Sequence, residues 1–568
     1  MTTLVVPGVR VEARFDVLPP LPAPSGILGA VGIVDRPPAS SGLITVSKIS
    51  ELRQILGPGT EVSMPEVVHA LANGASEAVI SPVTGGGPAS LTLQNDAAVN
   101  AVILRTRSNG SWGNDLKADV STILDALGNT VRVNLRLYLS GALVESFTDL
   151  QHKAGAPDDL FETINRKSRY VVAVDPVAQS WLPEPTNAPT TTYEFSDLVT
   201  SLNVARKGNA ETIFVMRPAD GVSPSGLSVE ISVNETASNI DLKIFQGGLR
   251  EEFNDLVMNP DDDNYLPYVL EARSRFIRVT VQSSLADSLP AATSGLASFA
   301  GGTSPSVANY QAAIDLLSDD SRIDLVLASI EPKRSNTDVR TIHQSLVAHA
   351  VTMADNGAPR IAFGSVTADE QSDLSKIKDH ASSVRNRRFV LVSPAGAAGA
   401  VAGMIGRMRP QFSPTFKSVP LHGLAPAAYR ESELNRLLGP STNLLVVQNR
   451  VGRGVVVLRG LDTSGDQISV TRVADQAIRE TKAISENFIG RLNTDDARTA
   501  LKQQIVATFT RMERDNALVP STDGSDPAFF VDVYSTQQDF AQGIVRIDIA
   551  VRPVRAIDYI YATIRVKN

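Results

Sequence analysis

The sequence contains no cysteine, which excludes disulfides, thiolate metal ligands and a cysteine nucleophile. This composition is compatible with assembly in a reducing bacterial cytoplasm. Lys and Arg together number 53 against 61 Asp and Glu, so no basic excess is present to neutralise nucleic-acid phosphates. The most apolar run of small residues, 395–405, is far shorter than the ~20 residues that a membrane span requires. These absences predict no nucleic-acid partner and no direct membrane insertion.

Familiar catalytic motifs are missing as well. No His-Glu-x-x-His, Gly-x-Ser-x-Gly or phosphate-loop motif occurs. His343 and His349 share an expected helix, but a spacing of six places them on different faces. The glycines of segment 399–406 lack the order of a dinucleotide fingerprint, and small residues that let a helix approach its neighbour explain them as well or better. We therefore predict no catalytic residue, no cofactor and no metal site.

The 568 residues, 43% of them hydrophobic and 20% charged, are enough for three or four packed domains. The continuous apolar run 26–34 predicts a strand that is buried on both faces. The segment 63–66 has the pattern of a capping box, which predicts a helix that starts there and ends at Gly74.

Strand and helix patterns alternate again after residue 306. Apolar strands are expected at 323–330, 360–363 and 389–392, with a capping box at 367–370 opening one of the helices between them. Such alternation is typical of a mostly parallel sheet covered on both faces. We predict one α/β domain, formed by residues 25–84 and 300–425 and split by a long insertion.

The insertion contains an internal repeat. Residues 143–150 match 249–256 at an offset of 106, and the same offset pairs 168–171 with 274–277. Alternating patterns at 131–139 and 227–233 predict strands in both copies. We predict two related β-rich modules in tandem, residues 85–190 and 191–299.

Residues 426–568 are expected to form an α+β polymerisation domain. A Gly-Arg-Gly turn at 452–454 separates two short strand patterns, and long helices are expected at 471–490 and 494–516. Three further strands are expected at the C-terminal side, and their ranges are 529–534, 544–551 and 557–566.

Both ends of the chain carry strand patterns. In the N-terminal segment 1–24, a strand pattern is followed by the proline-rich stretch 18–24, which behaves as a stiff spacer and cannot close a hairpin. The apolar positions of the two arms are Val9, Val11, Ala13, Phe15 and Val17 at one end and Ile560, Ala562, Ile564 and Val566 at the other. Such arms suggest strands lent to other copies of the chain, although pairing within one subunit fits the pattern too.

The order of motifs resembles that of contractile tail sheath proteins, which occur in contractile-tailed phages, R-type bacteriocins and related injection systems. The segments that carry the resemblance are 7–12, 29–34, the Gly-x-Trp-Gly-Asn stretch within 107–116, 401–403 and 452–455. The tryptophan that usually follows the Gly-Arg-Gly strand is replaced near residues 457–459, and Val392-Ser393-Pro394 stands where the family often has Pro-Trp.

The resemblance implies a structural subunit, not an enzyme, that polymerises helically around an inner tube and contracts to drive the tube through an envelope. It implies that terminal arms of neighbouring subunits join a small sheet in the C-terminal domain, with the inserted modules facing outward. Its implied partners are other copies of itself, the inner tail tube protein, and baseplate and terminator proteins. The subunit would assemble in the bacterial cytoplasm and become part of a virion tail or contractile particle.

On the same reading, Arg472, Arg479 and Lys482 are candidates for contact with an acidic tube surface. A solvated helix face explains these three cations equally well. Two other functions stay open: a baseplate or surface structural protein with tandem β modules, and an enzyme that binds a ligand at the carboxyl ends of the α/β strands.

Overall fold

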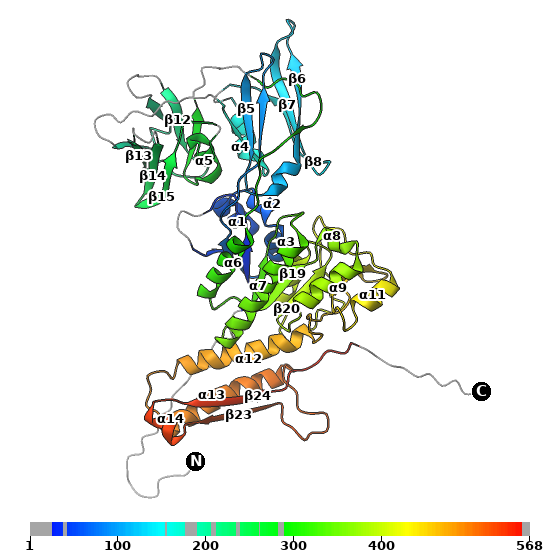
Figure 1. Cartoon of the computed structure of the whole chain (residues 1–568). Coiled ribbons are helices and arrows are strands. Elements are labelled where there is room, and N and C mark those ends of the chain that lie inside the picture. The colour runs from blue at the N-terminus through cyan, green and yellow to red at the C-terminus, as the bar shows by residue number, and fades with distance from the viewer. Residues whose placement is uncertain are drawn as a thin grey trace, which may run out of the picture.

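The computed structural model describes residues 25–37, 42–153, 156–176, 190–205, 212–234, 239–260, 262–281 and 289–558. These residues form an elongated molecule with the inserted modules at one end, the α/β sheet in the middle and two long helices at the other end (Figure 1). The expected mixed α/β multidomain architecture is confirmed. The apolar positions of both predicted arms, from Val9 to Val17 and from Ile560 to Val566, lie outside the described residues.

The central element is an eight-stranded sheet of order β2-β3-β1-β18-β19-β20-β21-β22. The six inner strands pair with one another in parallel, whereas the edge strands β2 and β22 each pair antiparallel with their neighbour. Chain segments from both sides of the insertion share this sheet, because Leu28 lies in register with Leu325. The strands are β1 Ile27–Gly32, β2 Ile44–Val46, β3 Glu77–Pro82, β18 Leu325–Ala328, β19 Ile361–Ser365, β20 Phe389–Ser393, β21 Leu445–Arg450 and β22 Gly454–Val457.

Two hydrophobic clusters cover the two faces of this sheet. The first contains buried residues of α1 Ile49–Leu56, α3 Pro65–Asn73 and α10 Ala398–Arg407, with α2 Thr60–Ser63 beside them. The second contains buried residues of α6 Val307–Leu316, α7 Asn336–Asp355, α9 Leu374–Ser383 and α11 Glu431–Leu437, with the short helices η2 Leu317–Asp319 and α8 Ala368–Gln371 nearby. Burial on both faces explains why the inner strands β1, β18, β19 and β20 are almost entirely apolar.

One expected capping box is wrong and another is confirmed. Helix α3 starts at Pro65, and its N-cap Met64 makes no side-chain capping bond. Ser63 instead ends α2 and donates its hydroxyl proton to the carbonyl of Ile33 at 2.5 Å. Thr367 does cap α8, with the reciprocal bonds to Glu370 that define a capping box.

The strand–turn–strand unit expected in the C-terminal domain belongs to the α/β sheet instead. Strand β21 continues the sheet because Leu445 pairs in parallel with Val392 of β20. The turn at Gly452–Gly454 is present and leads into β22. The α/β sheet therefore reaches beyond the expected limit at residue 425.

The insertion consists of two modules with the same parts. Each has a three-stranded sheet, a three-stranded meander with one extra edge strand, and a helix. The first module and its edge strand comprise β4 Ser90–Gln94, β5 Asn100–Thr106, η1 Ser111–Asp115, β6 Leu116–Leu124, β7 Thr130–Leu139, β8 Ala142–Leu150, α4 Leu160–Lys167, β9 Val171–Val174 and β17 Ala297–Ser298. The second comprises β10 Thr190–Glu194, β11 Leu202–Ala205, β12 Thr212–Pro218, β13 Leu227–Asn234, β14 Asn239–Gln246, β15 Leu249–Leu256, α5 Leu266–Arg273 and β16 Ile277–Val281.

The repeat extends to individual hydrogen bonds. Ser168 donates to Glu145 at 2.6 Å in the first module, and Ser274 donates to Glu251 at 2.7 Å in the second. The two alternating strands cited from the sequence are not counterparts, however. Strand β7 lies in the middle of its meander as β14 does, whereas 227–233 forms β13, the counterpart of β6.

The C-terminal helices are α12 Ile468–Glu486 and α13 Asp495–Arg514, close to the expected ranges. They are followed by β23 Phe529–Tyr534, α14 Gln537–Ala541 and β24 Arg546–Val551. Most of the strand expected at 557–566 lies outside the described residues.

Candidate strand-docking sheet

Strands β23 and β24 form a two-stranded antiparallel sheet, with Val531 opposite Ile549. Within the described residues, no third strand pairs with either outer edge. An unpaired edge presents a row of backbone N–H and C=O groups that can accept another strand. A two-stranded sheet is also marginally stable by itself and needs a partner layer.

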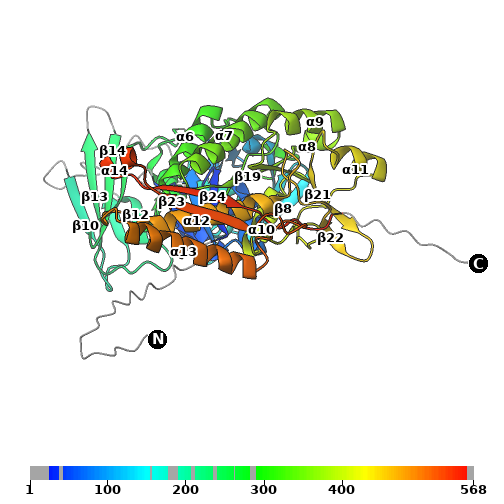
Figure 2. The ribbon, with the colours of Figure 1, turned by 90° about the horizontal axis from the view of Figure 1, so that it is seen from below.

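Helix α13 supplies that layer. Its buried apolar side chains follow helical spacing: Leu501, Ile505, Phe509 and Met512. The Phe509 ring contacts the Phe529 ring of β23 edge to face at 5.6 Å between centroids. Figure 2, which views the molecule from below, shows both strands lying along α12 and α13. The helix pair thus holds the sheet on one face and leaves its two edges open.

Coverage of this small domain is incomplete. Ile547, Ile549 and Val551 pack against the core but are only half-buried. Larger exposures occur at Phe530 on β23, which is 57% exposed, and at Leu492 in the α12–α13 loop, which is 81% exposed. Exposed apolar surface next to open strand edges is typical of a surface that another chain covers.

The three cations predicted to face a tube lie on α12. Arg472 is 6% exposed and donates to the carbonyl of Met408 at 3.0 Å and to the Ser25 hydroxyl at 3.3 Å. Arg479 donates to the carbonyls of Ser321 and Pro359 at 2.9 and 2.6 Å. Both guanidinium groups therefore join α12 to the α/β domain, so neither is a cation of a solvated helix face.

Lys482 has a different environment. Its side chain is exposed, and its ammonium lies 3.5 Å from the carbonyl of Asn356. It is the one member of the predicted set that the structure leaves on an open surface.

The junction beside Arg472 was not predicted. The Asp324 carboxylate accepts hydrogen bonds from the backbone N–H groups of Gly26 at 3.0 Å and Ile27 at 2.8 Å. Burial raises the pKa of Asp324, while these N–H groups and the charges of Arg472 and Arg479 oppose the rise. The cluster fixes the start of β1, the point where the N-terminal segment joins the body of the molecule. A lone Asp before a strand gives no sequence signal for this contact.

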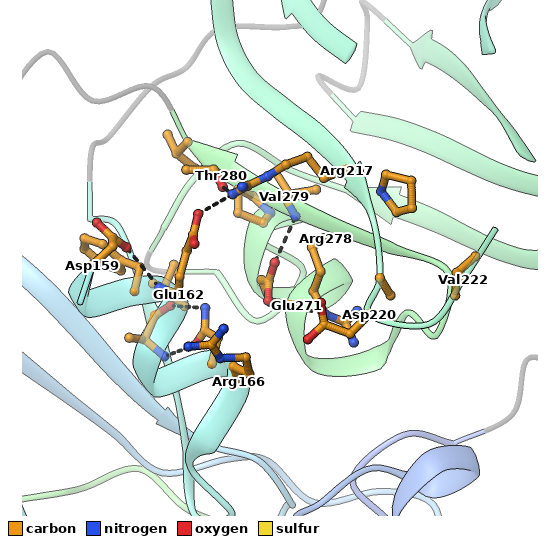
Figure 3. Close-up of a pocket in the computed structure, with 18 of the residues that line it drawn as sticks. Asp159, Glu162, Arg166, Arg217, Asp220, Val222, Glu271, Arg278, Val279 and Thr280 are labelled. Carbon is orange, nitrogen blue, oxygen red and sulfur yellow. Dashed lines mark hydrogen bonds and ion pairs between the residues drawn. The ribbon is translucent and has the colours of Figure 1, made fainter. Parts of the chain in front are cut away.

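A cavity of about 670 Å³ lies between the two inserted modules (Figure 3). Glu162 of α4 pairs across it with Arg217 of β12, which also donates to the Thr280 hydroxyl at 2.8 Å. Glu271 accepts a hydrogen bond from the backbone of Val279 at 2.8 Å, and its burial raises its pKa. Because these charges are engaged with one another, the cavity is a crevice with ion pairs across it.

A second buried polar cluster lies under α7, α8 and α9. Glu370 contacts His380 at 2.7 Å, and His380 contacts His343 at 2.9 Å between ring nitrogens. Burial holds the pKa of His343 well below its usual value. The three side chains are buried, so these hydrogen bonds tie α7, α8 and α9 together inside the core.

Two further observations concern the described residues. No group of three or more His, Asp or Glu side chains there is arranged to hold a metal ion. None of the described helices has the length and apolar character needed to cross a membrane.

Fold and site together define a multidomain α/β protein with an open two-stranded sheet in its C-terminal domain. Residues 462–567 match the family model described as the phage tail sheath C-terminal domain. This match covers α12, α13, β23 and β24, and it confirms the resemblance to contractile tail sheath proteins. The match is confined to this C-terminal part of the chain.

Solved structures similar to this chain include two sheath tail proteins. The one from Desulfitobacterium hafniense is 13% identical with a TM-score of 0.45, covering 99% of this chain and 100% of that chain. The one from Listeria innocua is 11% identical with a TM-score of 0.43, covering 94% and 93%. The contracted helical sheath of the anti-feeding prophage is 17% identical with a TM-score of 0.35, covering 45% and 74%. No curated protein matches the sequence.

Proposed function

We propose that this chain is the structural subunit of a contractile tail sheath that polymerises helically around an inner tube. The observation that carries the proposal is the open β23–β24 sheet, which lies inside the region that matches the sheath C-terminal domain family. A subunit of this kind needs a surface that binds its neighbours, and its function requires no catalytic site.

The terminal arms are proposed as the strands that fill the open edges. In the N-terminal arm, Val9, Val11, Ala13, Phe15 and Val17 alternate with charged residues, so one face would pack on a neighbour's core. In the C-terminal arm the corresponding apolar positions are Ile560, Ala562, Ile564 and Val566. Backbone hydrogen bonds would supply affinity, and the apolar alternation would set the register.

Contraction is proposed to be a rigid-body movement of subunits that remain tied through these arms. The proline-rich stretch 18–24 is a stiff spacer that lets a strand dock at a distance from its own body. Energy would be stored because the extended lattice is metastable, and the contracted lattice would bury more surface. No nucleotide is needed at the moment of firing in this scheme.

The proposed partners are other copies of the chain, an inner tail tube protein, and baseplate and terminator proteins at the ends. The C-terminal domain would line the tube, with Lys482 as a weak electrostatic contact, and the inserted modules would face outward. The subunit would assemble in the bacterial cytoplasm and act as a component of a virion tail or contractile particle.

Negative-stain imaging of the full chain expressed alone tests the proposal. Hollow striated tubes are expected, and a monodisperse monomer over a wide range of salt and concentration would overturn it. The alternative function, a baseplate or surface structural protein with tandem β modules, predicts that monomer.

Removal of residues 1–17 tests the role of the N-terminal arm. Tubes should disappear while a folded monomer remains, as judged by circular dichroism and sedimentation. A matched pair sharpens the test: Val11→Asp/Phe15→Asp places charge on the apolar face, whereas Arg10→Ser/Glu12→Ser changes only the other face. Equal effects of the two double variants, or loss of folding on truncation, would mean that the arm does not act by strand donation to a neighbour.

A further inference from the structure

A basic corner projects from the end of the β21–β22 hairpin. Val451 at its tip is fully exposed, and the guanidinium groups of Arg450 and Arg453 lie over the Phe416 ring at 4.4 and 4.9 Å from its centroid. Lys417 is the residue directly after Phe416, and it is exposed too. We call these five residues the hairpin patch.

The charges of the hairpin patch are not used within the subunit. In the described part of the chain, Arg450, Arg453 and Lys417 form no ion pair, and neither guanidinium donates a hydrogen bond. Stacking on one aromatic ring holds the two guanidinium groups in place but leaves their N–H edges free for bidentate contact with carboxylates. The patch is therefore preorganised for an acidic surface.

Backbone geometry supports a functional reading of this corner. Phe416 adopts a left-handed conformation with φ of 57°, which is costly for a bulky residue. The strain places its ring beneath both arginines. The backbone from Phe416 to Val419 also runs beside β22, with the Phe416 N–H donating to Val457 at 2.7 Å. Since this segment covers the sheet edge, any contact here must use side chains.

An acidic corner lies on the opposite side of the same sheet. Asp315, Asp319 and Asp355 are exposed, and none has an ion-pair partner among the described residues. We call these three residues the helix-end corner. A hydrogen bond of 3.1 Å from Gln311 to Ser345 joins α6 and α7 along their length.

The ends of both helices add to the negative potential of the helix-end corner. Helices α6 and α7 each precede a parallel strand, so their carboxyl ends lie together at the amino ends of the strands. Two exposed cations lie beside the corner and offset part of the charge: Lys482, and Arg322, which pairs with Asp320 and Glu77. The corner nevertheless keeps an acidic excess.

The two patches lie diagonally across the subunit. The hairpin patch is at the edge strand β22 and at the carboxyl ends of the strands, whereas α6 packs near β1 and β3 toward the other edge. Figure 2 shows α6 and β22 on opposite sides of the α/β domain. Complementary patches on opposite sides of one subunit form a head-to-tail contact, which builds an open helical assembly when the rotation between copies does not close a ring.

We infer that the hairpin patch of one copy docks on the helix-end corner of a second copy, forming a lattice contact separate from the strand arms. The inference rests on the proposed function, because it assigns one contact within the proposed homopolymer. Its chemistry is guanidinium to carboxylate at a partly apolar surface, so added salt should weaken it.

Charge-swap variants of the full chain test this contact. Arg450→Glu/Arg453→Glu and Asp315→Lys/Asp319→Lys should each raise the protein concentration needed for tube formation about tenfold or more, as measured by sedimentation and negative stain. A 1:1 mixture of the two double variants should restore assembly, because each mutated patch then meets a complementary one. The control Lys48→Glu/Lys378→Glu changes the net charge as much as the hairpin variant does, at exposed sites elsewhere, and should assemble like the wild type.

The outcomes separate this inference from the proposed function. Failure of the wild type to form tubes would overturn the proposed function and this contact with it. Wild-type tubes together with normal assembly of either double variant would overturn the contact alone. Loss of assembly in both variants without rescue on mixing would also overturn the pairing, provided that circular dichroism shows both variants folded.

Discussion

Glu66 lies in the core of the α/β domain, where its carboxylate is hydrogen-bonded to the Ser329 hydroxyl. Burial raises the pKa of Glu66 from 4.5 to about 7, and the bond from Ser329 only partly opposes the rise. In the unfolded chain the group ionises near its ordinary pKa. Deprotonation thus favours the unfolded state, and the stability contributed by the neutral form is lost as the pH rises from about 4.5 to 7.

We expect Glu66→Gln to stabilise the protein at alkaline pH, because the amide keeps a polar partner for Ser329 without a buried charge. The free energy of unfolding should rise by about 3 kcal/mol at pH 8 and by less than about 1 kcal/mol at pH 5. Urea unfolding at the two pH values measures both changes. Glu486→Gln, at an exposed position, is the control and should change neither value. An equal gain at both pH values would contradict the electrostatic account.

At the scale of elements, helix α10 packs against α3 through its glycines. A Cβ on Gly399 would lie 1.9 Å from the Glu66 carbonyl oxygen, and a Cβ on Gly403 would lie 2.1 Å from that of Ala70. The backbones of the two helices therefore touch directly. Such a close helix contact is what the glycine pattern of segment 399–406 predicts.

Gly403→Ala should force these helices apart and lower the free energy of unfolding by about 3 kcal/mol, as expected for overpacking against backbone. Thermal or urea denaturation measures the loss. Gly295→Ala serves as the control, because nothing lies within 4 Å of its Cβ position. A Gly403→Ala variant as stable as this control would show that the helices can separate without cost.

The two inserted modules share a serine–glutamate lock at the end of the helix. In the second module, the buried Ser274 hydroxyl donates to Glu251 and accepts the N–H groups of Phe276 and Ile277 at 3.2 Å each. Ser168 makes the same set of bonds in the first module. The shared bonds explain why the repeat is clearest at these positions.

Ser274→Ala should destabilise the second module by about 2 kcal/mol, because it leaves a buried carboxylate and two buried N–H groups with fewer partners. Faster limited proteolysis within 191–299 would report the change. Ser168→Ala should act in the same way on residues 85–190, while the exposed Ser225→Ala should act on neither. If a single substitution increased cleavage equally in both modules, the claim that each serine stabilises only its own module would be contradicted.

At the scale of the whole molecule, the insertion leaves and re-enters the α/β domain at one place. Gly87 and Thr303 exchange two backbone hydrogen bonds of 3.0 and 3.1 Å. The insertion also contacts the body through a buried ion pair, in which Arg107 and Asp35 lie 3.8 Å apart. Because Gly87 and Thr303 are adjacent, the insertion can be removed without displacing the ends that it joins. The ion pair between Arg107 and Asp35 links the insertion to the α/β domain.

Replacing residues 88–302 by a short Gly-Ser linker of about four residues should leave a soluble chain that unfolds cooperatively, because the linked ends are adjacent. We expect some loss of stability from the unpaired Asp35. If the proposed function holds, tubes of smaller outer diameter should form, as measured by negative stain. An aggregated product would mean that the insertion is needed for the α/β domain to fold.

Several elements followed directly from local sequence patterns. The apolar run 26–34, the glycine stop at Gly74, the capping box at Thr367 and the apolar face of α13 are each decided by neighbours in the chain. The repeat was visible because the same tertiary lock recurs at a fixed offset. The open sheet could be expected only through the family resemblance.

Other features depend on residues far apart in sequence. Ser63 had the right spacing for a cap, but the packing of α2 turned its hydroxyl to the carbonyl of Ile33. Arg472 and Arg479 had the pattern of a solvated helix face, yet the α/β domain covers that face and takes both guanidinium groups. Strand β21 belongs to the central sheet because it pairs in parallel with β20.

The sequence by itself determined the local structure, the duplication and the alternating arms, because periodicity and turn chemistry act over a few residues. Only the tertiary structure decided which sheet each strand joined, which cations stayed exposed and where charged corners lay across the subunit. These depend on contacts between segments hundreds of residues apart, for which spacing along the chain carries no information.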